Sequence, residues 1–232
     1  MKTNFSQQLL TLRKEKELAH LKMQMLLTQI NPHFIFNSLN SIDYLILKQN
    51  YRAASRHLNR FAHLMRRLLK NAKVDEVSLK DDLKALKLYV DIEKLRFRQQ
   101  FEVLFNIAEN IDLDFIRVPP MLLQPYVENA IWHGLLHKKE GGKIELIYEL
   151  DEEQEVLKCT VLDNGIGREK SIDLKARQIP TGNQKSFGLN SVEDLVEILN
   201  LLYERPTNIQ IFDLYDEAQN GIGTKVEVEI GV

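Results

Sequence analysis

The spacing of apolar residues changes near residue 100, and this change constrains the fold more than any other feature of the sequence. Before this point, apolar residues recur every three or four positions, which is typical of helices that bury one side. From residue 101 onward they alternate over short stretches, which is typical of strands. We therefore predict an α+β protein, with a helical first part at residues 1–75 and a two-layer α/β sandwich at residues 76–232.

The helical first part contains a heptad seam and a predicted helical hairpin. From Phe5 to Ile30 the apolar residues alternate at spacings of four and three, interrupted only by Lys16. So narrow a stripe favours a parallel dimer contact, whereas the alternative is a helix packed on its own domain. Two more stripes, at residues 35–46 and 54–68, flank a polar turn. We expect them to form a hairpin, and two hairpins to form the four-helix bundle of a homodimer.

The second part is expected to alternate strands with helices. Ser78 and Asp81 resemble a capping box and predict a helix that runs to about Arg98. A long polar segment at residues 168–187 predicts a lid, because ordinary connections are shorter. The remaining predicted elements are strands at residues 101–107 and 111–115 around a turn at Asn110, a helix from Pro119-Pro120 to Trp132, a strand hairpin at residues 143–150 and 155–162, a helix at residues 189–203, and strands at residues 208–215 and 224–230.

The stretch at residues 29–40 places a histidine at a predicted helix turn. Asn31-Pro32 can start a helix or kink one that is already running, and His33 follows directly in either case. No Asp or Glu occurs from residue 18 to 42, so a metal site or a carboxylate-oriented histidine is hard to build locally. A lone histidine is more often part of a core than reactive, but the three asparagines of this stretch do not suit a purely structural helix. These residues alone leave both interpretations open.

Composition excludes several classes of protein. The 31 Lys and Arg against 33 Asp and Glu give a net charge of -2, which offers no general attraction to nucleic acid or to an anionic membrane. The single cysteine, Cys159, excludes an internal disulfide framework, fits a reducing compartment and is expected to be a small buried hydrophobe. We find no signal peptide and no apolar run long enough to cross a bilayer, so a cytoplasmic location is expected.

Short motifs in the second part could bind a nucleotide. Asn129 lies on a predicted helix, where its amide oxygen could bind a magnesium ion that is held mainly by phosphates. The D-x-G-x-G motif at residues 163–167 places a carboxylate acceptor where an adenine amino group could donate, and its glycines would let the base approach the backbone. Gly188 opens a helix whose amides could receive phosphate, and residues 221–224 precede the last strand. Each glycine alone is more often a turn, but their joint occurrence favours a nucleotide site.

Taken together, these motifs resemble those of the LytS-like sensor histidine kinases, from about residue 15 to the end of the chain. Residues 29–40, QINPHFIFNSLN, are nearly the family's phosphoacceptor box, and residues 123–134, LQPYVENAIWHG, resemble its N box. The second part is similar to the GHKL-type (Bergerat) ATPase domain that histidine kinases share with gyrase-type topoisomerases and MutL. The resemblance implies that His33 is the nucleophile and that Asn129 is a magnesium ligand. The nucleotide-binding residues that it implies are Asn129, His133, Asp163, Gly165, Gly167, Gly188, Leu189 and Thr224.

The implied reaction is transfer of the γ-phosphoryl group of ATP, with Mg²⁺, to His33 and then to an aspartate of a receiver-domain response regulator. In such kinases a polar residue four positions after the histidine orients the water that hydrolyses the phosphoaspartate, so Asn37 is assigned this role by resemblance. From spacing alone, a surface amide is an equal interpretation of Asn37. The alternative for the whole chain is a GHKL-type ATP-binding regulatory module, or a protein-serine kinase, without a phosphorylated histidine.

The sequence departs from the family pattern at two positions. Ser186 stands where the family usually has a lid glycine, and Trp132 stands where a lysine is frequent, which removes one possible phosphate contact. Relatives of this kind are joined to membrane sensor regions. We therefore expect the cytoplasmic portion of a membrane-associated sensor, with any membrane contact made by a region outside this chain.

Overall fold

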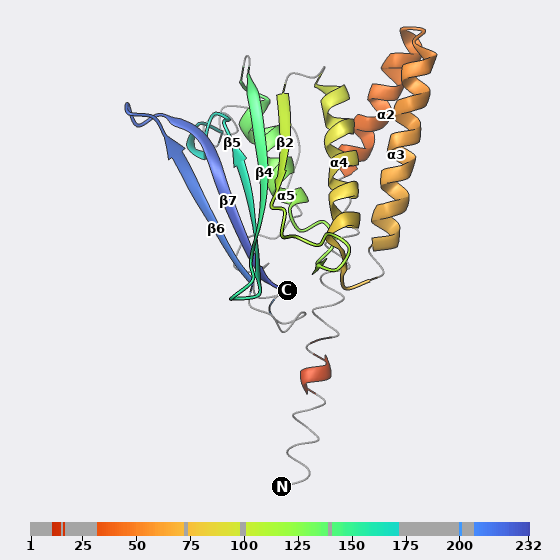
Figure 1. Ribbon diagram of the computed structural model, residues 1–232. Helices are drawn as coiled ribbons and strands as arrows, with labels where there is room; N and C mark the ends of the chain where they lie inside the picture. The colour runs from red at the N-terminus through yellow and green to blue at the C-terminus, as the bar shows by residue number, and fades with distance from the viewer. Residues whose placement is uncertain are drawn as a thin grey trace.

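The computed structural model describes residues 11–14, 16, 32–71, 74–97, 101–138, 141–171, 200 and 207–232 (Figure 1). Helices precede residue 100 and the long strands follow it, so the predicted α+β class is confirmed. The predicted heptad seam and the predicted helix at residues 189–203 lie almost entirely outside the described residues, as does most of the predicted lid. Among the described helices, none is long and apolar enough to cross a membrane.

The first part is an antiparallel helical hairpin, as predicted. Helix α2 (Pro32–Leu47) begins at the proline, and α3 (Tyr51–Asn71) follows a short turn. The side-chain oxygen of Asn50 accepts a hydrogen bond from the backbone N–H of Ala53 at 3.2 Å, which satisfies a free donor at the start of α3. The two helices bury one side each, because residues with helical spacing face the same way. These buried residues are Phe34, Ser38 and Ile42 on α2, and Ala54, His57, Leu64, Leu68 and Asn71 on α3.

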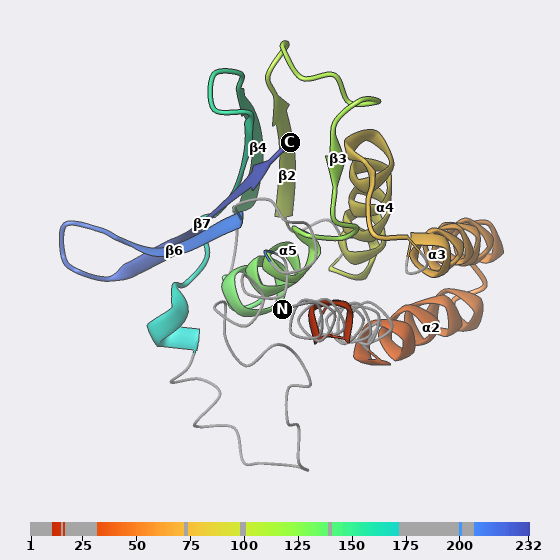
Figure 2. The same ribbon diagram turned by 90° about the horizontal axis from the view of Figure 1, so that it is seen from below.

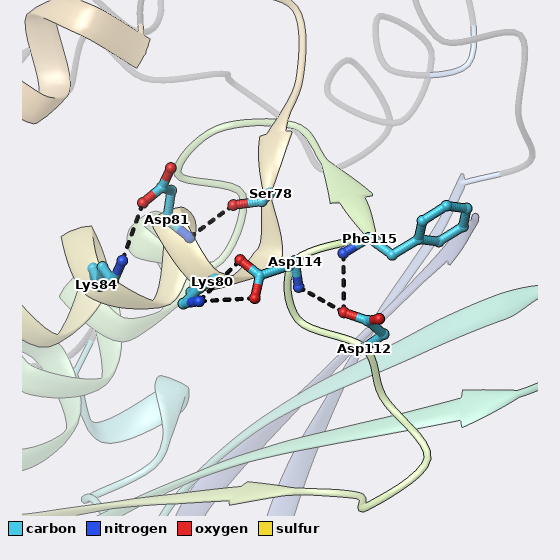
Figure 3. A network of polar contacts seen from close by, with 7 residues as sticks. All are labelled: Ser78, Lys80, Asp81, Lys84, Asp112, Asp114 and Phe115. Atoms are coloured by element: carbon cyan, nitrogen blue, oxygen red, sulfur yellow. Dashed lines mark hydrogen bonds and ion pairs between the residues drawn. The ribbon is translucent and has the colours of Figure 1, made fainter.

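Helix α4 (Leu79–Arg96) connects the hairpin to the sheet and starts at the predicted cap. The hydroxyl of Ser78 accepts from the backbone N–H of Asp81 at 3.2 Å, as Figure 3 shows. Lys80 donates to both carboxylate oxygens of Asp114, at 2.9 and 2.7 Å. These bonds fix the first turn of α4 against the loop that follows β2.

The predicted strand at residues 111–115 is wrong. The carboxylate of Asp112 accepts from the backbone N–H groups of Asp114 and Phe115, at 2.9 and 3.2 Å, and bends this segment into a turn (Figure 3). The chain then forms the short strand β3 (Arg117–Val118), which pairs antiparallel with β1 (Val77–Ser78). A short polar side chain has thus overridden the alternation of apolar residues.

The second part is built on a five-stranded mixed sheet with the order β2-β4-β5-β7-β6. The strands are β2 (Phe101–Ile107), β4 (Gly142–Asp151), β5 (Val156–Asp163), β6 (Thr207–Tyr215) and β7 (Gly221–Gly231). Strand β2 runs parallel to β4, and the other neighbours are antiparallel. Ile144 and Leu146 are buried on one face, whereas the other face carries charged pairs such as Lys158 with Glu227 at 3.2 Å. Figure 2 shows α5 on the inner side of the bent sheet, so one face is the core and the other is solvated.

The helix that follows the paired prolines starts later than predicted. Met121 has a φ of 62°, which no helix accommodates, so α5 (Gln124–Asn129) begins beyond it, with Pro125 in its first turn. The carboxylate of Asp82 on α4 accepts from the backbone N–H of Met121 at 2.6 Å and holds this turn. Helix α5 continues directly into the π-helix η1 (Ala130–Leu135). Cys159 is buried and free, as predicted.

Candidate nucleotide-binding site

Asp163 lies at the end of β5 and is 5% exposed. One carboxylate oxygen accepts from the backbone N–H of Gly165 at 2.8 Å, and Thr224, opposite it on β7, also donates to this carboxylate. Burial raises the pKa of Asp163 to about 6, although these donors and nearby Lys138 oppose the rise. The carboxylate is therefore a buried acceptor that is mostly ionised near neutral pH.

The glycines around Asp163 allow two backbone segments to touch. A Cβ added at Gly165 would lie 2.4 Å from the Cα of Gly134, so only glycine permits this approach. The carbonyl of Gly134 accepts from the backbone N–H of Ile166 at 3.2 Å. The D-x-G-x-G motif predicts that Gly165 lets a base approach the backbone, whereas the structure places Gly165 against η1. Gly134 was not singled out, although it closes the string that resembles the N box.

Two further glycines allow the loop that follows β5 to pass close to the start of β7. Gly167 has a φ of 77°, a conformation that L side chains rarely adopt. A Cβ added at Gly223 would lie 2.0 Å from the carbonyl oxygen of Asp163, so β7 can pass this loop only with glycine there. The end of β5 and the start of β7 therefore form one tightly packed unit around the Asp163 carboxylate.

Lys138 and Asn164 close one side of this unit. The ammonium of Lys138 donates to the carbonyl of Asn164 at 2.6 Å. The side-chain oxygen of Asn164 accepts from the backbone N–H of Lys143 at 2.8 Å, and its amide donates to the carbonyl of Gly141 at 3.0 Å. No signal in the sequence identifies Lys138, because it lies outside every motif and approaches Asp163 only through the fold.

Asn129 and His133 lie on the helix that carries Gly134. Asn129 is the last residue of α5 and is exposed, and His133 on η1 is half-buried. Because Gly134 touches Asp163 and Gly165, the structure brings this helix to the D-x-G-x-G motif. No group of three or more His, Cys, Asp or Glu side chains in the described ranges could hold a metal ion. A magnesium ion at Asn129 would therefore depend on the oxygens of a bound phosphate group. The predicted residues Gly188 and Leu189 lie outside the described residues.

The proposed phosphoacceptor, His33, lies at the start of α2, which packs against α4. His33 is the second residue of α2, and its side chain lies outside the described part of the chain. The next residue, Phe34, packs against Tyr89 of α4, with ring centroids 5.1 Å apart. Asn37, one turn later, is half-buried, and its carbonyl accepts from the Ser41 hydroxyl at 2.8 Å. The structure thus places the start of α2 against α4.

Comparisons with known proteins identify the family of this chain. The family model described as Histidine kinase matches residues 21–101. The sensor protein LytS of Streptococcus mutans is 30% identical over 218 residues, which is 94% of this chain and 35% of that protein. The protein YwpD of Bacillus subtilis is 36% identical over 177 residues, which is 75% of this chain and 60% of that protein.

A solved structure, the histidine kinase domain of the Erythrobacter litoralis blue-light activated histidine kinase, aligns with 91% of this chain and 95% of that chain, at 16% identity and a TM-score of 0.42. The family assignment rests on the sequence matches and not on this structural alignment. The chain spans between 26% and 60% of the length of the first curated relatives that it matches. On these matches, the chain belongs to the family of LytS-like histidine kinases.

Proposed function

We propose that this chain is the catalytic core of a two-component sensor histidine kinase, which phosphorylates His33 from ATP and passes the phosphoryl group to an aspartate of a response regulator. One observation carries the proposal. The helix that bears Asn129 touches the Asp163 motif through Gly134, so a candidate magnesium ligand and a candidate adenine acceptor lie on two segments that are in direct contact. The family supplies a second support, since its sequence match includes the stretch around His33.

In this proposal, ATP binds with its adenine amino group donating to the Asp163 carboxylate. Thr224 and the glycines Gly165 and Gly167 keep that carboxylate in position, and Gly188 with Leu189 would receive the phosphates. Asn129 would bind Mg²⁺ together with the phosphate oxygens, and His133 would contact the nucleotide from the same helix. The protein contributes position and charge neutralisation, which are what phosphoryl transfer requires.

The transfer itself needs a neutral imidazole at His33. The first turn of α2 contains no acidic residue, so no carboxylate there holds a proton on the ring. An imidazole nitrogen would attack the γ-phosphorus, the bond to the bridging oxygen would break, and ADP would leave, while the ring proton passes to solvent. Asn37 would act later, on the water that hydrolyses the partner's phosphoaspartate, because an amide can both accept and donate without added charge.

We propose that residues 1–75 form the dimerisation and phosphoacceptor region and residues 76–232 the ATP-binding domain. The hairpin leaves large apolar side chains uncovered, which supports its pairing with a second copy in a bundle. They are Phe36, Leu39, Tyr44, Ile46 and Leu47 on α2, and Tyr51, Leu58 and Leu69 on α3. The input would come from a membrane-associated sensor region outside this chain, and this portion would lie in the cytoplasm.

The experiment that tests this function is incubation with γ-labelled ATP followed by treatment of the protein with acid and with alkali. Phosphohistidine is labile in acid and stable in alkali, so label with this behaviour is expected. Acid-stable label would support a serine kinase instead and would overturn the proposal. Nucleotide binding without any label would identify a regulatory module and would also overturn it.

A further inference from the structure

Three residues on one side of α4 connect the start of α2 with the helix that bears Asn129. Tyr89, Glu93 and Arg96 follow one another at spacings of four and three, so they form a single stripe along the helix. Tyr89 and Glu93 are fully buried, and Arg96 is half-buried. The proposed reaction uses none of them.

At one end of the stripe, Tyr89 contacts the residue that follows His33. The rings of Phe34 and Tyr89 lie 5.1 Å apart and are inclined at 35°, and Phe34 is itself 4% exposed. Phe61 of α3 supports Phe34 from the other side, at 6.2 Å. The first turn of α2 therefore has a fixed position relative to α4, because closely packed buried rings have little room to shift.

At the other end, Arg96 lies on the ring of Trp132. Its guanidinium carbon is 3.7 Å from the centroid of the ring, a close cation–π contact, and Phe97 meets the same ring edge-on at 5.4 Å. Trp132 follows Asn129 by three residues and directly precedes His133. Arg96 thus contacts the helical turn that carries both candidate nucleotide ligands.

Glu93 lies between Tyr89 and Arg96 on this stripe of α4. The carboxylate oxygen Oε2 of Glu93 lies 3.7 Å from the guanidinium nitrogen Nη1 of Arg96. Both atoms are buried and have no hydrogen-bond partner within the described residues. Burial raises the pKa of Glu93 to about 7, Arg96 opposes this rise, and Glu128 of α5 adds to it. Glu93 is therefore ionised only in part near neutral pH, and its attraction for Arg96 changes in this range.

We propose that Glu93 and Arg96 are positioning residues, which hold Trp132 and the turn from Asn129 to His133 at a fixed place relative to the start of α2. This inference rests on the proposed function, in which a phosphoryl group passes from a nucleotide at Asn129 to His33. Helix α4 suits the role because it is capped at both ends, by Ser78 and by the bond from the Phe97 N–H to the Glu93 carbonyl at 2.9 Å. Movement at one end of such a helix is passed to the other.

The first test uses Trp132, the only tryptophan of the chain, as a reporter. Its emission spectrum should change between pH 6 and pH 8 with a midpoint near 7, as Glu93 ionises. Glu93→Gln should abolish this change, whereas Asp91→Asn, an exposed carboxylate on the same helix, should retain it. The charged and titratable groups that face Glu93 are Arg96 and Tyr89 on α4 and Glu128 on α5. A transition that persists with the same midpoint in Glu93→Gln would show that a group other than Glu93 titrates, and would overturn the inference.

The second test perturbs the far end of the stripe. Phe34→Leu should shift the Trp132 emission, because Tyr89 and Glu93 pass the disturbance along α4. Ile42→Val, a core change two helical turns further along α2, should leave the emission unaltered. An unchanged spectrum in Phe34→Leu would overturn the coupling. This readout does not depend on catalysis, so it stands even if the protein incorporates no phosphate and the proposed function fails.

The third test separates positioning from nucleotide binding. Glu93→Gln and Arg96→Lys should lower the kcat of His33 phosphorylation at least tenfold, while the KM for ATP stays within twofold of the wild-type value. Trp132→Phe keeps an aromatic face for Arg96 and should restore most of the rate that Trp132→Leu loses. A rise in KM with unchanged kcat, or equal losses in Trp132→Phe and Trp132→Leu, would overturn the proposed role.

Discussion

The close approach of Gly165 to Gly134 makes Gly165→Ala a sharp perturbation of the pocket. The new Cβ would lie 2.4 Å from the Cα and 2.6 Å from the carbonyl carbon of Gly134, and 2.7 Å from a carboxylate oxygen of Asp163. Ordinary van der Waals contact begins at 3.4 Å, so the overlap with the backbone is about 1 Å. No rotamer change relieves it, because the atoms nearest to the new Cβ belong to the main chain.

The expected magnitude follows from this overlap. Forcing an extra methyl group into a packed interior costs about 1–3 kcal/mol. A cost of about 2 kcal/mol, released by moving η1 away from the Asp163 loop, corresponds to about a 30-fold change in an equilibrium constant. In our proposal, nucleotide binding requires that η1 stays in contact with the Asp163 loop. The Kd for ADP should therefore rise by about 30-fold.

Isothermal titration with ADP, together with urea unfolding, measures both effects. Gly141→Ala is the matched control, because nothing lies within 4 Å of its added Cβ while its φ of 69° strains any side chain. That control should lose about 1 kcal/mol of unfolding free energy but keep its ADP affinity. An unchanged ADP affinity in folded Gly165→Ala would show that the contact between η1 and this loop does not form the nucleotide site.

Three further changes test other parts of the account. Burial raises the pKa of Asp163 to about 6, and the adenine amino group should favour the ionised carboxylate. The affinity for ADP should therefore fall as the pH drops from 7 to 5. Calorimetry with Asp163→Asn should show a flatter dependence of this affinity on pH than wild type. At about pH 4, Asp82→Ala should lower the unfolding free energy by about 1–3 kcal/mol, because the Met121 N–H loses its buried acceptor, and urea unfolding should show a smaller loss in Asp82→Asn, which keeps that acceptor. The pKa of Asp82 is also raised to about 6, so its contribution to stability is greatest below about pH 4 and is lost as the pH rises through 6, a dependence that Asp82→Asn should lack. Asn37→Ala should retain labelling of His33 but slow the loss of phosphate from a phosphorylated receiver domain, and equal decay rates would leave Asn37 a structural amide.

Local signals in the sequence predicted the elements that depend on local chemistry. The helical hairpin, the cap at Ser78 and the strand hairpin of β4 and β5 were confirmed, the strand hairpin to within one residue at each end. Periodicity and short-range hydrogen bonds decide such elements, and both can be seen in a few consecutive residues. The D-x-G-x-G motif likewise lies at a strand end, as predicted, with Thr224 opposite Asp163.

Features that depend on distant partners were missed. The sequence paired residues 101–107 with residues 111–115, but β2 pairs with β4 and runs parallel to it. The tight contact between Gly134 and Gly165 and the bond from Met121 to Asp82 join residues that are 31 and 39 positions apart. Nothing near each residue indicates its partner, because the fold alone brings them together. The same holds for Arg96 over Trp132, which spans two elements.

The central claim is that His33 receives the phosphoryl group from a nucleotide bound in a separate part of the chain. The most direct measurement compares His33→Gln with wild type for ADP affinity and for acid-labile label from γ-labelled ATP. We predict unchanged ADP affinity and complete loss of the acid-labile label in the variant. Acid-labile label that persists in His33→Gln would contradict the claim, because another residue would then carry the phosphoryl group.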